Sequence, residues 1–208
     1  MDILITAGPT REFIDDVRYI SNASSGRMGC ALVRAAMAAG HRVTFVCGPI
    51  ECEPPECDTL VPVTSADEMC RAVLEHGRDA DVIIMAAAVA DYRPAERACG
   101  KIKKTGSELV LRLVLTPDIL AELGRAKTPR QVLVGFALES ADARDNALRK
   151  LREKNLDLIV VNGPAAMGAD RAPVELLFAS GESQILDEAP KSEIADRIIA
   201  AVQNITRK

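Results

Sequence analysis

The sequence has 208 residues and a net charge of −4 at neutral pH. This length suits one domain with a full hydrophobic core, so we expect a single domain over residues 1–208. Four Phe, two Tyr and no Trp, with the acidic charge, argue against a nucleic-acid partner, which needs basic surfaces and stacking rings. We expect a cytoplasmic protein without a membrane partner, because the sequence has no long apolar run and no signal-peptide features.

The first elements alternate between strand and helix. The apolar run at 3–8 precedes Gly-Pro and has the length of a buried strand. Small and apolar residues at helical spacing predict a helix over 29–40, which ends at a glycine. The β-branched run at 42–48 predicts a second strand buried on both faces.

The middle of the chain continues this rhythm and then breaks it. Ser65 and Glu68 have the spacing of a capping box, which predicts a helix over 65–77. An apolar run predicts a third strand at 80–92 that runs into an alanine-rich segment. Residues 96–108 are polar, basic and glycine-containing, which indicates a surface loop.

The C-terminal part predicts strands at 109–115, 131–140 and 156–162, helices at 116–126, 142–155 and 191–205, and a hairpin of 174–180 with 183–188. Repeated strand–helix units predict an α/β fold, with a Rossmann-like open, mostly parallel sheet and helices on both faces. The hairpin predicts an antiparallel edge. Ligands of such sheets lie outside the carboxyl ends of the strands, so we examine the loops there.

The loop "ISNASSGRMG" (20–29) enters the first helix. Ser24, Ser25 and Gly26 lie where free N–H groups and the helix dipole suit phosphate oxygens. Asn22, just before them, can both donate and accept hydrogen bonds. The alternative is a capped helix with a glycine for close packing. The GxGxxG glycines are missing, which argues against NAD.

Two further loops carry candidate chemistry. In "AAAVADY" (86–92) a flat ring could lie against the alanines, and Asp91 could accept from a ribose hydroxyl. The alternative is a packed core strand with Asp91 as a cap. In "KIKK" (101–104) the lysines suit either a solvated loop or a lid in which Lys101 closes over a triphosphate.

A fourth candidate is the pair Lys150 and Lys154, one helical turn apart, which could meet phosphates while Phe136 meets a ring. Salt bridges to Glu153 or Asp145 are the alternative. The six cysteines indicate reduced thiols. Their one suggestive cluster, Cys47, Cys52 and Cys57, matches zinc-ligand spacing poorly.

Together, these segments resemble phosphopantothenoylcysteine synthetase. The motifs are "ITAGPTREFIDDVRYISNASSGRMG", "AAAVADYRP", "KIKK", "TPDIL", "VGFALES" and "LREKNLDLIVVN", in the family's order over residues 3–162. The long first motif and "KIKK" are specific, whereas "TPDIL" alone is not. The resemblance implies a ligase that activates 4'-phosphopantothenate with CTP as an acyl-cytidylate, releases pyrophosphate, and joins the acyl group to cysteine.

The resemblance also implies roles for individual residues. Asn22 would hold the acyl-cytidylate, and Lys101 would act from a flexible loop. The cytidine would be lined by Met85, Ala86, Ala87 and Asp91. The nucleotide site would be completed by Pro117, Asp118, Ile119, Leu120, Phe136, Lys150 and Lys154.

The resemblance further implies Mg²⁺, with ligands it does not identify, and a homodimer. Relatives use CTP in bacteria and ATP in eukaryotes, and bacterial relatives are commonly fused behind a decarboxylase domain. Two alternatives stay open. A short-chain oxidoreductase would need Tyr-x₃-Lys, which neither tyrosine offers. A non-catalytic nucleotide-binding module would bind the nucleotide without turnover.

Overall fold

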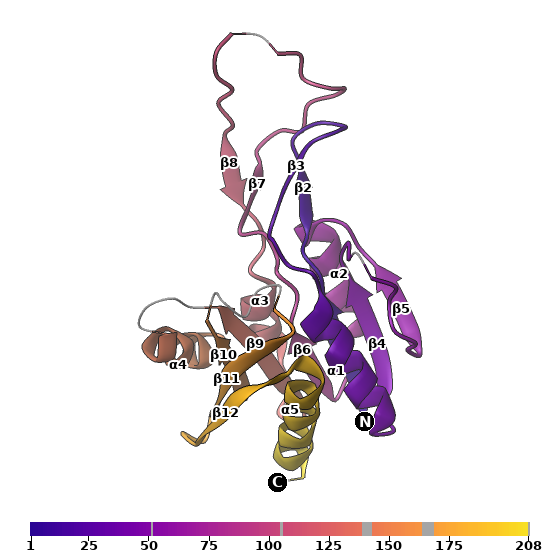
Figure 1. The fold of residues 1–208 in the computed structure, drawn as a ribbon, viewed down its shortest axis with the longest axis vertical. Coiled ribbons are helices and arrows are strands. Elements are labelled where there is room, and N and C mark those ends of the chain that lie inside the picture. Colours follow the sequence, from indigo (N-terminus) through magenta and orange to yellow (C-terminus); the bar gives the residue numbers. More distant parts are fainter. Residues whose placement is uncertain (51, 105, 139–142, 164–168, 208) are drawn as a thin grey trace.

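The computed structural model describes residues 1–50, 52–104, 106–138, 143–163 and 169–207 (Figure 1). Within them, the main sheet has eight strands in the order β12-β11-β10-β9-β6-β1-β4-β5. Their bounds are β1 Asp2–Ala7, β4 Arg42–Cys47, β5 Thr59–Pro62, β6 Val82–Met85, β9 Val132–Leu138, β10 Leu158–Asn162, β11 Arg171–Phe178 and β12 Ser183–Pro190. The strands from β10 to β5 pair in parallel, whereas β11 and β12 are antiparallel. The predicted mostly parallel sheet with an antiparallel C-terminal hairpin is confirmed.

Helices cover both faces of this sheet. Their bounds are α1 Arg27–Ala38, α2 Ala66–His76, α3 Ile119–Ala126, α4 Ala143–Glu153 and α5 Lys191–Thr206. α1 and α5 pack beside each other in one hydrophobic cluster, and α2, α3 and α4 share the cluster on the opposite face. The predicted strand at 131–140 and helix at 142–155 extend into residues 139–142, outside the described part.

Strand β1 shows why its sequence is apolar without alternation. Ile3 and Ile5 point into the α1–α5 cluster, while Leu4 points into the other, and all three are at most 1% exposed. Burial of each such side chain contributes about 1.5–3 kcal/mol. Gly29 lets α1 approach this strand closely, because a Cβ there would lie 2.3 Å from the Cβ of Ala7.

Two local predictions had different outcomes. The capping box of α2 is confirmed, since the Ser65 hydroxyl accepts from the Glu68 N–H at 3.2 Å and the Glu68 carboxylate accepts from the Ser65 N–H. The predicted strand at 80–92 is too long, because β6 ends at Met85. After it, the N–H of Ala87 donates to the Thr6 hydroxyl, so the chain leaves the ladder there.

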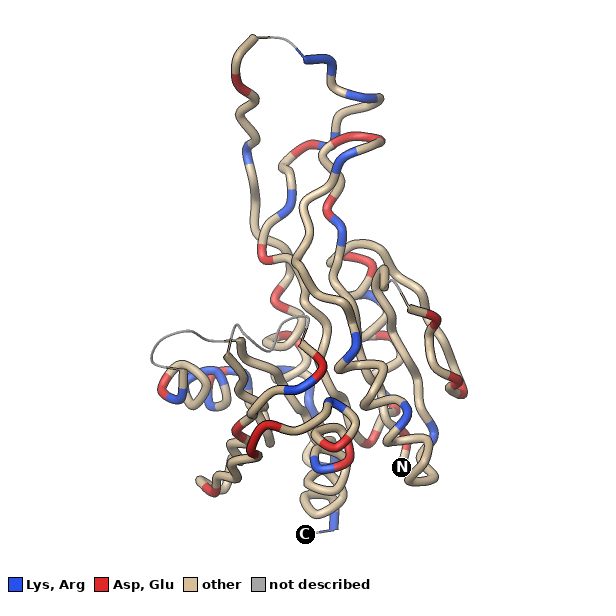
Figure 2. Tube along the Cα trace, viewed as in Figure 1, with Lys and Arg blue, Asp and Glu red and all other residues tan. Residues whose placement is uncertain are grey.

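Two small antiparallel sheets form an arm that projects from the carboxyl edge of the main sheet (Figure 1). We call residues 11–21 and 92–115 the arm. Its strands are β2 Arg11–Phe13 with β3 Tyr19–Ser21, and β7 Tyr92–Pro94 with β8 Leu113–Leu115. The predicted strand at 109–115 forms over 113–115 alone, because only those residues pair with β7. Figure 2 shows basic residues at the end of the arm farthest from the main sheet.

The structure bears on three other expectations. No helix among the described residues is long and apolar enough to cross a membrane, and a cytoplasmic location stays a prediction. All six cysteines are free thiols, with the Sγ atoms of Cys30 and Cys52 4.0 Å apart. No cluster of three or more candidate metal ligands occurs in the described part of the chain.

Candidate functional site

A pocket of about 670 Å³ opens at the carboxyl ends of the parallel strands, at the base of the arm. This is where open α/β sheets hold their ligands. It contains most of the residues selected from the sequence, namely Asn22, Ser24, Ser25, Gly26, Met85, Ala86, Ala87, Asp91, Pro117, Asp118, Ile119, Leu120, Phe136 and Lys154. The fold therefore brings together five separate motifs, while Lys101 and Lys150 do not line the pocket.

The N-terminus of α1 opens into this pocket. Its N-cap, Gly26, has a φ of +74° and lies against Ile50, whose Cγ2 would be 2.4 Å from an added Cβ. No side chain caps the helix and its first turn has no acidic residue. The alternative of a capped helix is therefore wrong about a side-chain cap, while its glycine for close packing is confirmed. The uncapped end of the helix favours an anion.

Asn22 is fixed by its amide nitrogen. This nitrogen donates to the backbone carbonyls of Ala88 and Val89, at 3.1 and 3.0 Å. Both side-chain N–H groups are thus used, and the side-chain carbonyl oxygen is left as an acceptor. The Asn22 side chain can therefore accept a hydrogen bond from a donor such as an amine.

The alanine-rich segment after β6 is held by backbone and threonine contacts. The N–H groups of Ala87, Ala88 and Ala90 donate to Thr6, Gly8 and Thr10 at 2.9–3.0 Å. These bonds fix a non-strand conformation in which Ala86, Ala87 and Asp91 line the pocket. The alternative in which the whole segment is a packed core strand is wrong.

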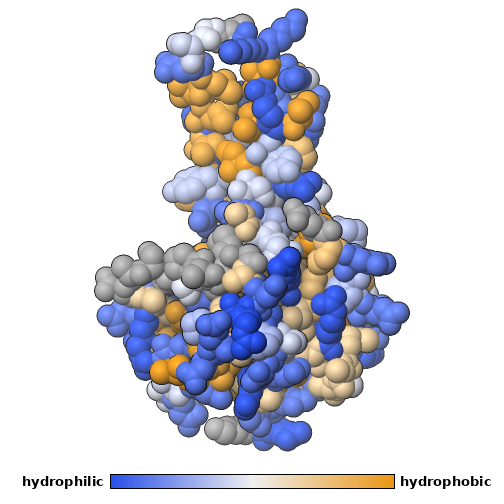
Figure 3. All heavy atoms as spheres, viewed as in Figure 1, coloured by the Kyte–Doolittle hydropathy of each residue, from blue (hydrophilic) through white to orange (hydrophobic). Residues whose placement is uncertain are grey.

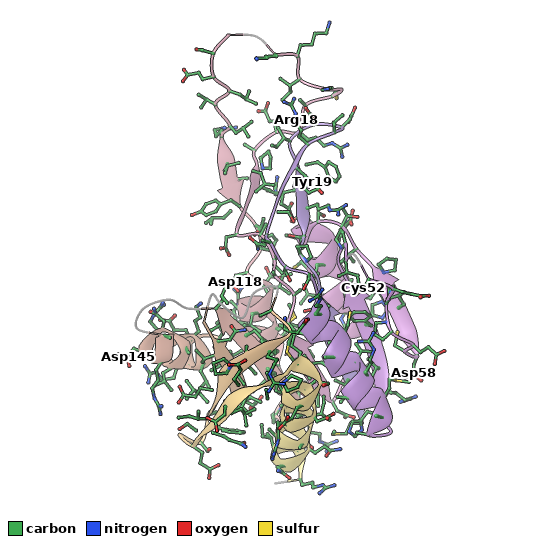
Figure 4. All side chains as sticks on the ribbon, in the orientation of Figure 1. Arg18, Tyr19, Cys52, Asp58, Asp118 and Asp145 are labelled. Carbon is green, nitrogen blue, oxygen red and sulfur yellow. The ribbon has the colours of Figure 1, made fainter. Side chains whose placement is uncertain are left out.

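Asp118 and Lys154 meet at the other side of the pocket. Asp118 caps α3 by accepting from the Ala121 N–H at 3.0 Å, and its carboxylate lies 2.8 Å from Lys154 Nζ. Burial raises the pKa of Asp118, but hydrogen bonds from Lys154 and Ala121 and the Lys154 charge lower it more, so the net pKa lies below the ordinary value. Lys154 pairs with Asp118 rather than with Glu153 or Asp145, and Figure 4 shows Asp118 beside α3.

Lys101 lies in the arm, in the segment between β7 and β8, and is exposed. The N–H of the next residue, Ile102, donates to the Asp15 carboxylate at 3.0 Å, and its carbonyl accepts from Arg18 at 3.0 Å. The predicted lid is therefore attached to the first hairpin of the arm, and Lys101 is held away from the pocket of its own chain.

A match over nearly the whole chain identifies its protein family. Residues 1–205 match the family described as DNA/pantothenate metabolism flavoprotein C-terminal domain. The chain belongs to this family.

Relatives of the chain were found among curated proteins and solved structures. A protein named cysteine/cysteine sulfinic acid decarboxylase, from an unknown prokaryotic organism, is 44% identical over 205 residues, which cover 96% of this chain and 57% of that protein. The coenzyme A biosynthesis bifunctional protein CoaBC of Haemophilus influenzae is 43% identical over 188 residues, which cover 89% of this chain and 47% of that protein. A crystal structure of the C-terminal domain of a CoaBC protein has a TM-score of 0.87 and 40% identity, covering 99% of this chain and 95% of that one. The chain spans about half the length of these curated relatives.

Sequence reasoning missed part of the pocket of this family member. Arg27, Ala172, Val174, Lys191 and Ile194 line it from α1, β11 and the start of α5. Arg27 directly follows the selected Gly26 and could have been chosen from the helix-start argument. The others lie far away in the sequence: the pairing of β11 with β10 brings Ala172 and Val174 to the pocket, and the packing of α5 beside α1 brings Lys191 and Ile194.

Proposed function

We propose that this chain is a phosphopantothenate–cysteine ligase. The observation that carries the proposal is the convergence of five of the six sequence motifs on one pocket at the carboxyl edge of the sheet. Likeness to the C-terminal domain of CoaBC proteins supports it, since those proteins are named for coenzyme A biosynthesis. The pocket-lining residues are those of the ligase motifs, so we propose ligation rather than the decarboxylation in another relative's name.

The proposed reaction has two steps. A carboxylate oxygen of phosphopantothenate attacks the α-phosphorus of CTP, and pyrophosphate leaves with the electron pair of the broken P–O bond. The amine of cysteine then attacks the acyl carbon of the acyl-cytidylate, CMP leaves, and the nitrogen loses a proton. Such chemistry depends on positioning and charge stabilisation, which suits a pocket of backbone and small side chains.

Asn22 has a defined part in this proposal. Its amide nitrogen is held by two backbone carbonyls, so its oxygen can accept from the incoming amine of cysteine. Ser24, Ser25 and the N-terminus of α1 would hold phosphate oxygens, while Met85–Ala87, Asp91 and Phe136 would line the nucleoside.

Mg²⁺ is part of the proposal, and the residues fit an ion brought in by the nucleotide. Two carboxylates line the pocket, Asp91 and Asp118, and the second is already paired with Lys154. Mg²⁺ commonly binds through one or two carboxylates with substrate phosphates and water. Asp91 would supply the protein ligand, and the ion would neutralise charge on the triphosphate.

A homodimer is proposed with the arm as its interface. Val17, Tyr92, Leu109, Val110 and Leu115 are large apolar side chains on the arm, and each is more than half exposed. Figure 3 shows apolar side chains gathered over the arm. A contiguous exposed apolar patch commonly marks a protein interface, and a second copy of the chain is the occupant we propose.

The test of the function is direct. The chain is incubated with phosphopantothenate, cysteine, Mg²⁺ and either CTP or ATP, and pyrophosphate release is followed. We expect release that depends on phosphopantothenate and is faster with CTP. Absence of release with either nucleotide would contradict the proposal. In a separate incubation, reduction of NAD(P) with hydride from an added alcohol substrate would instead favour the oxidoreductase.

A further inference from the structure

Two cationic residues lie side by side at the α1–α5 edge of the pocket. Arg27 is the first residue of α1, Lys191 is the first residue of α5, and both line the pocket. The two helices pack against each other on one face of the sheet (Figure 1), so these helix starts lie at the same edge. Neither helix has a side-chain N-cap.

Asp170 lies next to both cations. Arg27 Nη1 lies 2.6 Å from the Asp170 carboxylate, and the Lys191 N–H donates to the Asp170 carbonyl at 3.1 Å. The Asp170 carboxylate thus counters part of the positive charge of both residues. Burial lowers the pKa of the Lys191 ammonium, the Arg27 charge lowers it further, and Asp170 opposes the change. The two cations are close enough to repel each other, and an anion bound between them would relieve this repulsion.

We propose that Arg27 and Lys191 bind a phosphate group of a substrate. The inference deepens the proposed function and rests on it, because that reaction brings a nucleoside triphosphate and a phosphate ester into one pocket. The cation on the opposite side, Lys154, is paired with Asp118, so it does not serve this edge. The shared chemistry is a phosphate dianion, and its source is either the terminal phosphates of the nucleotide or the ester of phosphopantothenate.

The geometry gives the two residues different parts. The guanidinium of Arg27 is oriented by Asp170 and can offer planar donors to two oxygens of one phosphate. The ammonium of Lys191 is a compact charge that is half-buried at the edge of the pocket. A phosphate between them would also face the positive end of α5, which favours the anion further.

The first experiment measures binding without turnover. Inorganic pyrophosphate is titrated into the wild-type chain, Lys191→Gln and Arg27→Gln by calorimetry. We expect each substitution to weaken binding by about 10- to 100-fold, the range for a lost charged hydrogen bond. Lys191→Arg should restore most of the affinity. Arg197→Gln is the matched control, because Arg197 is exposed on the same helix and does not line the pocket.

The second experiment identifies the source of the phosphate. The KM values for CTP and for phosphopantothenate are measured separately in Lys191→Gln. A raised KM for CTP alone assigns the site to the nucleotide, and a raised KM for phosphopantothenate alone assigns it to the ester. Unchanged pyrophosphate affinity together with both KM values unchanged would overturn the inference.

The two proposals can fail independently. A wild-type chain that binds pyrophosphate through Lys191 but shows no ligation would contradict the ligase and keep the phosphate site. Ligation that is unaffected in Lys191→Gln and Arg27→Gln would keep the ligase and reject the site. Thermal unfolding of each variant checks that a loss of binding does not come from a loss of fold.

Discussion

The buried carboxylate of Asp15 accepts a hydrogen bond from the backbone N–H of Ile102 at 3.0 Å and so joins the two hairpins of the arm. The same carboxylate accepts from the N–H groups of Val17 and Arg18 at 2.8 and 2.7 Å, and from Arg18 Nε at 2.9 Å. Figure 4 shows Arg18 in the upper part of the arm, next to Tyr19. On the other side of Lys101, the N–H of Gly100 donates to the Asp16 carboxylate at 2.9 Å, so two neighbouring acidic residues hold the segment that carries Lys101.

Asp15→Asn should loosen this junction. The amide can accept fewer of these hydrogen bonds and loses the charge that pairs with Arg18. We therefore expect faster hydrogen exchange of the Ile102 amide. We also expect faster tryptic cleavage in the same segment, at Lys101, Lys103 and Lys104. Exchange mass spectrometry and limited proteolysis measure both effects. Glu96→Gln is the control, because Glu96 is exposed and its contact with Arg112 is 3.7 Å long. Equal exchange in wild type and Asp15→Asn would contradict this role.

The same carboxyl sets a pH dependence. Hydrogen bonds from Arg18 lower the pKa of Asp15 far below its ordinary value of 3.8, burial opposes this, and N–H groups of Val17, Ile102 and Arg18 lower it further. Because the folded pKa lies below the unfolded one, the stabilisation is complete above pH 3.8 and is lost as the pH falls toward the folded pKa. An NMR titration should place the Asp15 midpoint well below 3.8, and a midpoint at or above that value would be inconsistent with the junction.

Lys101→Ala should reduce ligation by about 10²–10³-fold, the range for one lost charge-stabilising group, while CTP binding and unfolding temperature change little. Steady-state pyrophosphate release and calorimetry with CTP give the two quantities. Lys103→Ala is the matched control from the same segment. A variant that loses CTP affinity without any loss of turnover would support a binding module instead. Lys101→Ala is also mixed with an inactive Asn22 variant. Recovered activity would mean that Lys101 of one chain acts at the pocket of a second copy.

Asn22→Asp should slow the second step. A carboxylate would face the carbonyl oxygens of Ala88 and Val89, lose both donated hydrogen bonds and move away from its present position. We expect the acyl-cytidylate to accumulate and cysteine capture to slow, as measured by quenched single-turnover chromatography. Asn204→Asp, an equal charge change at an exposed site on α5, should leave the rates unchanged. Product formation at the wild-type rate would remove Asn22 from the proposal.

Val110→Asp should weaken the proposed dimer. Val110 is 83% exposed on the arm, so a charge there costs little in the single chain but much at a buried apolar interface. Light scattering over a concentration series should show a larger monomer fraction with the unfolding temperature nearly unchanged. Ile185→Asp, at an equally exposed apolar position on β12, is the control. A monomeric wild-type chain would contradict the interface.

The residue pattern predicts the main sheet except β5, together with the five helices of the described part of the chain, and the family resemblance adds most of the pocket residues. A short continuous apolar run bounded by Gly-Pro, such as that around Leu4, favours a strand buried on both faces, and the Ser65–Glu68 spacing predicts a helix start without tertiary information. Asn22 could be selected because it precedes a helix start near the carboxyl end of a parallel strand, where ligands bind, whereas Asp118 is selected through the family resemblance.

Only the tertiary structure decided the arm and the far side of the pocket. β2 and β3 have three residues each and are held by side-chain contacts such as Phe13 on Tyr19, which no local period reveals. Lys191 lies 164 positions after Arg27, and the two reach one edge because α5 packs beside α1. Lys101 lies away from its own pocket because Asp15 holds the neighbouring residue on the arm. The arm, the Arg27–Lys191 edge and the position of Lys101 all depend on contacts between residues far apart in the sequence. A local sequence pattern does not show which distant residues make those contacts.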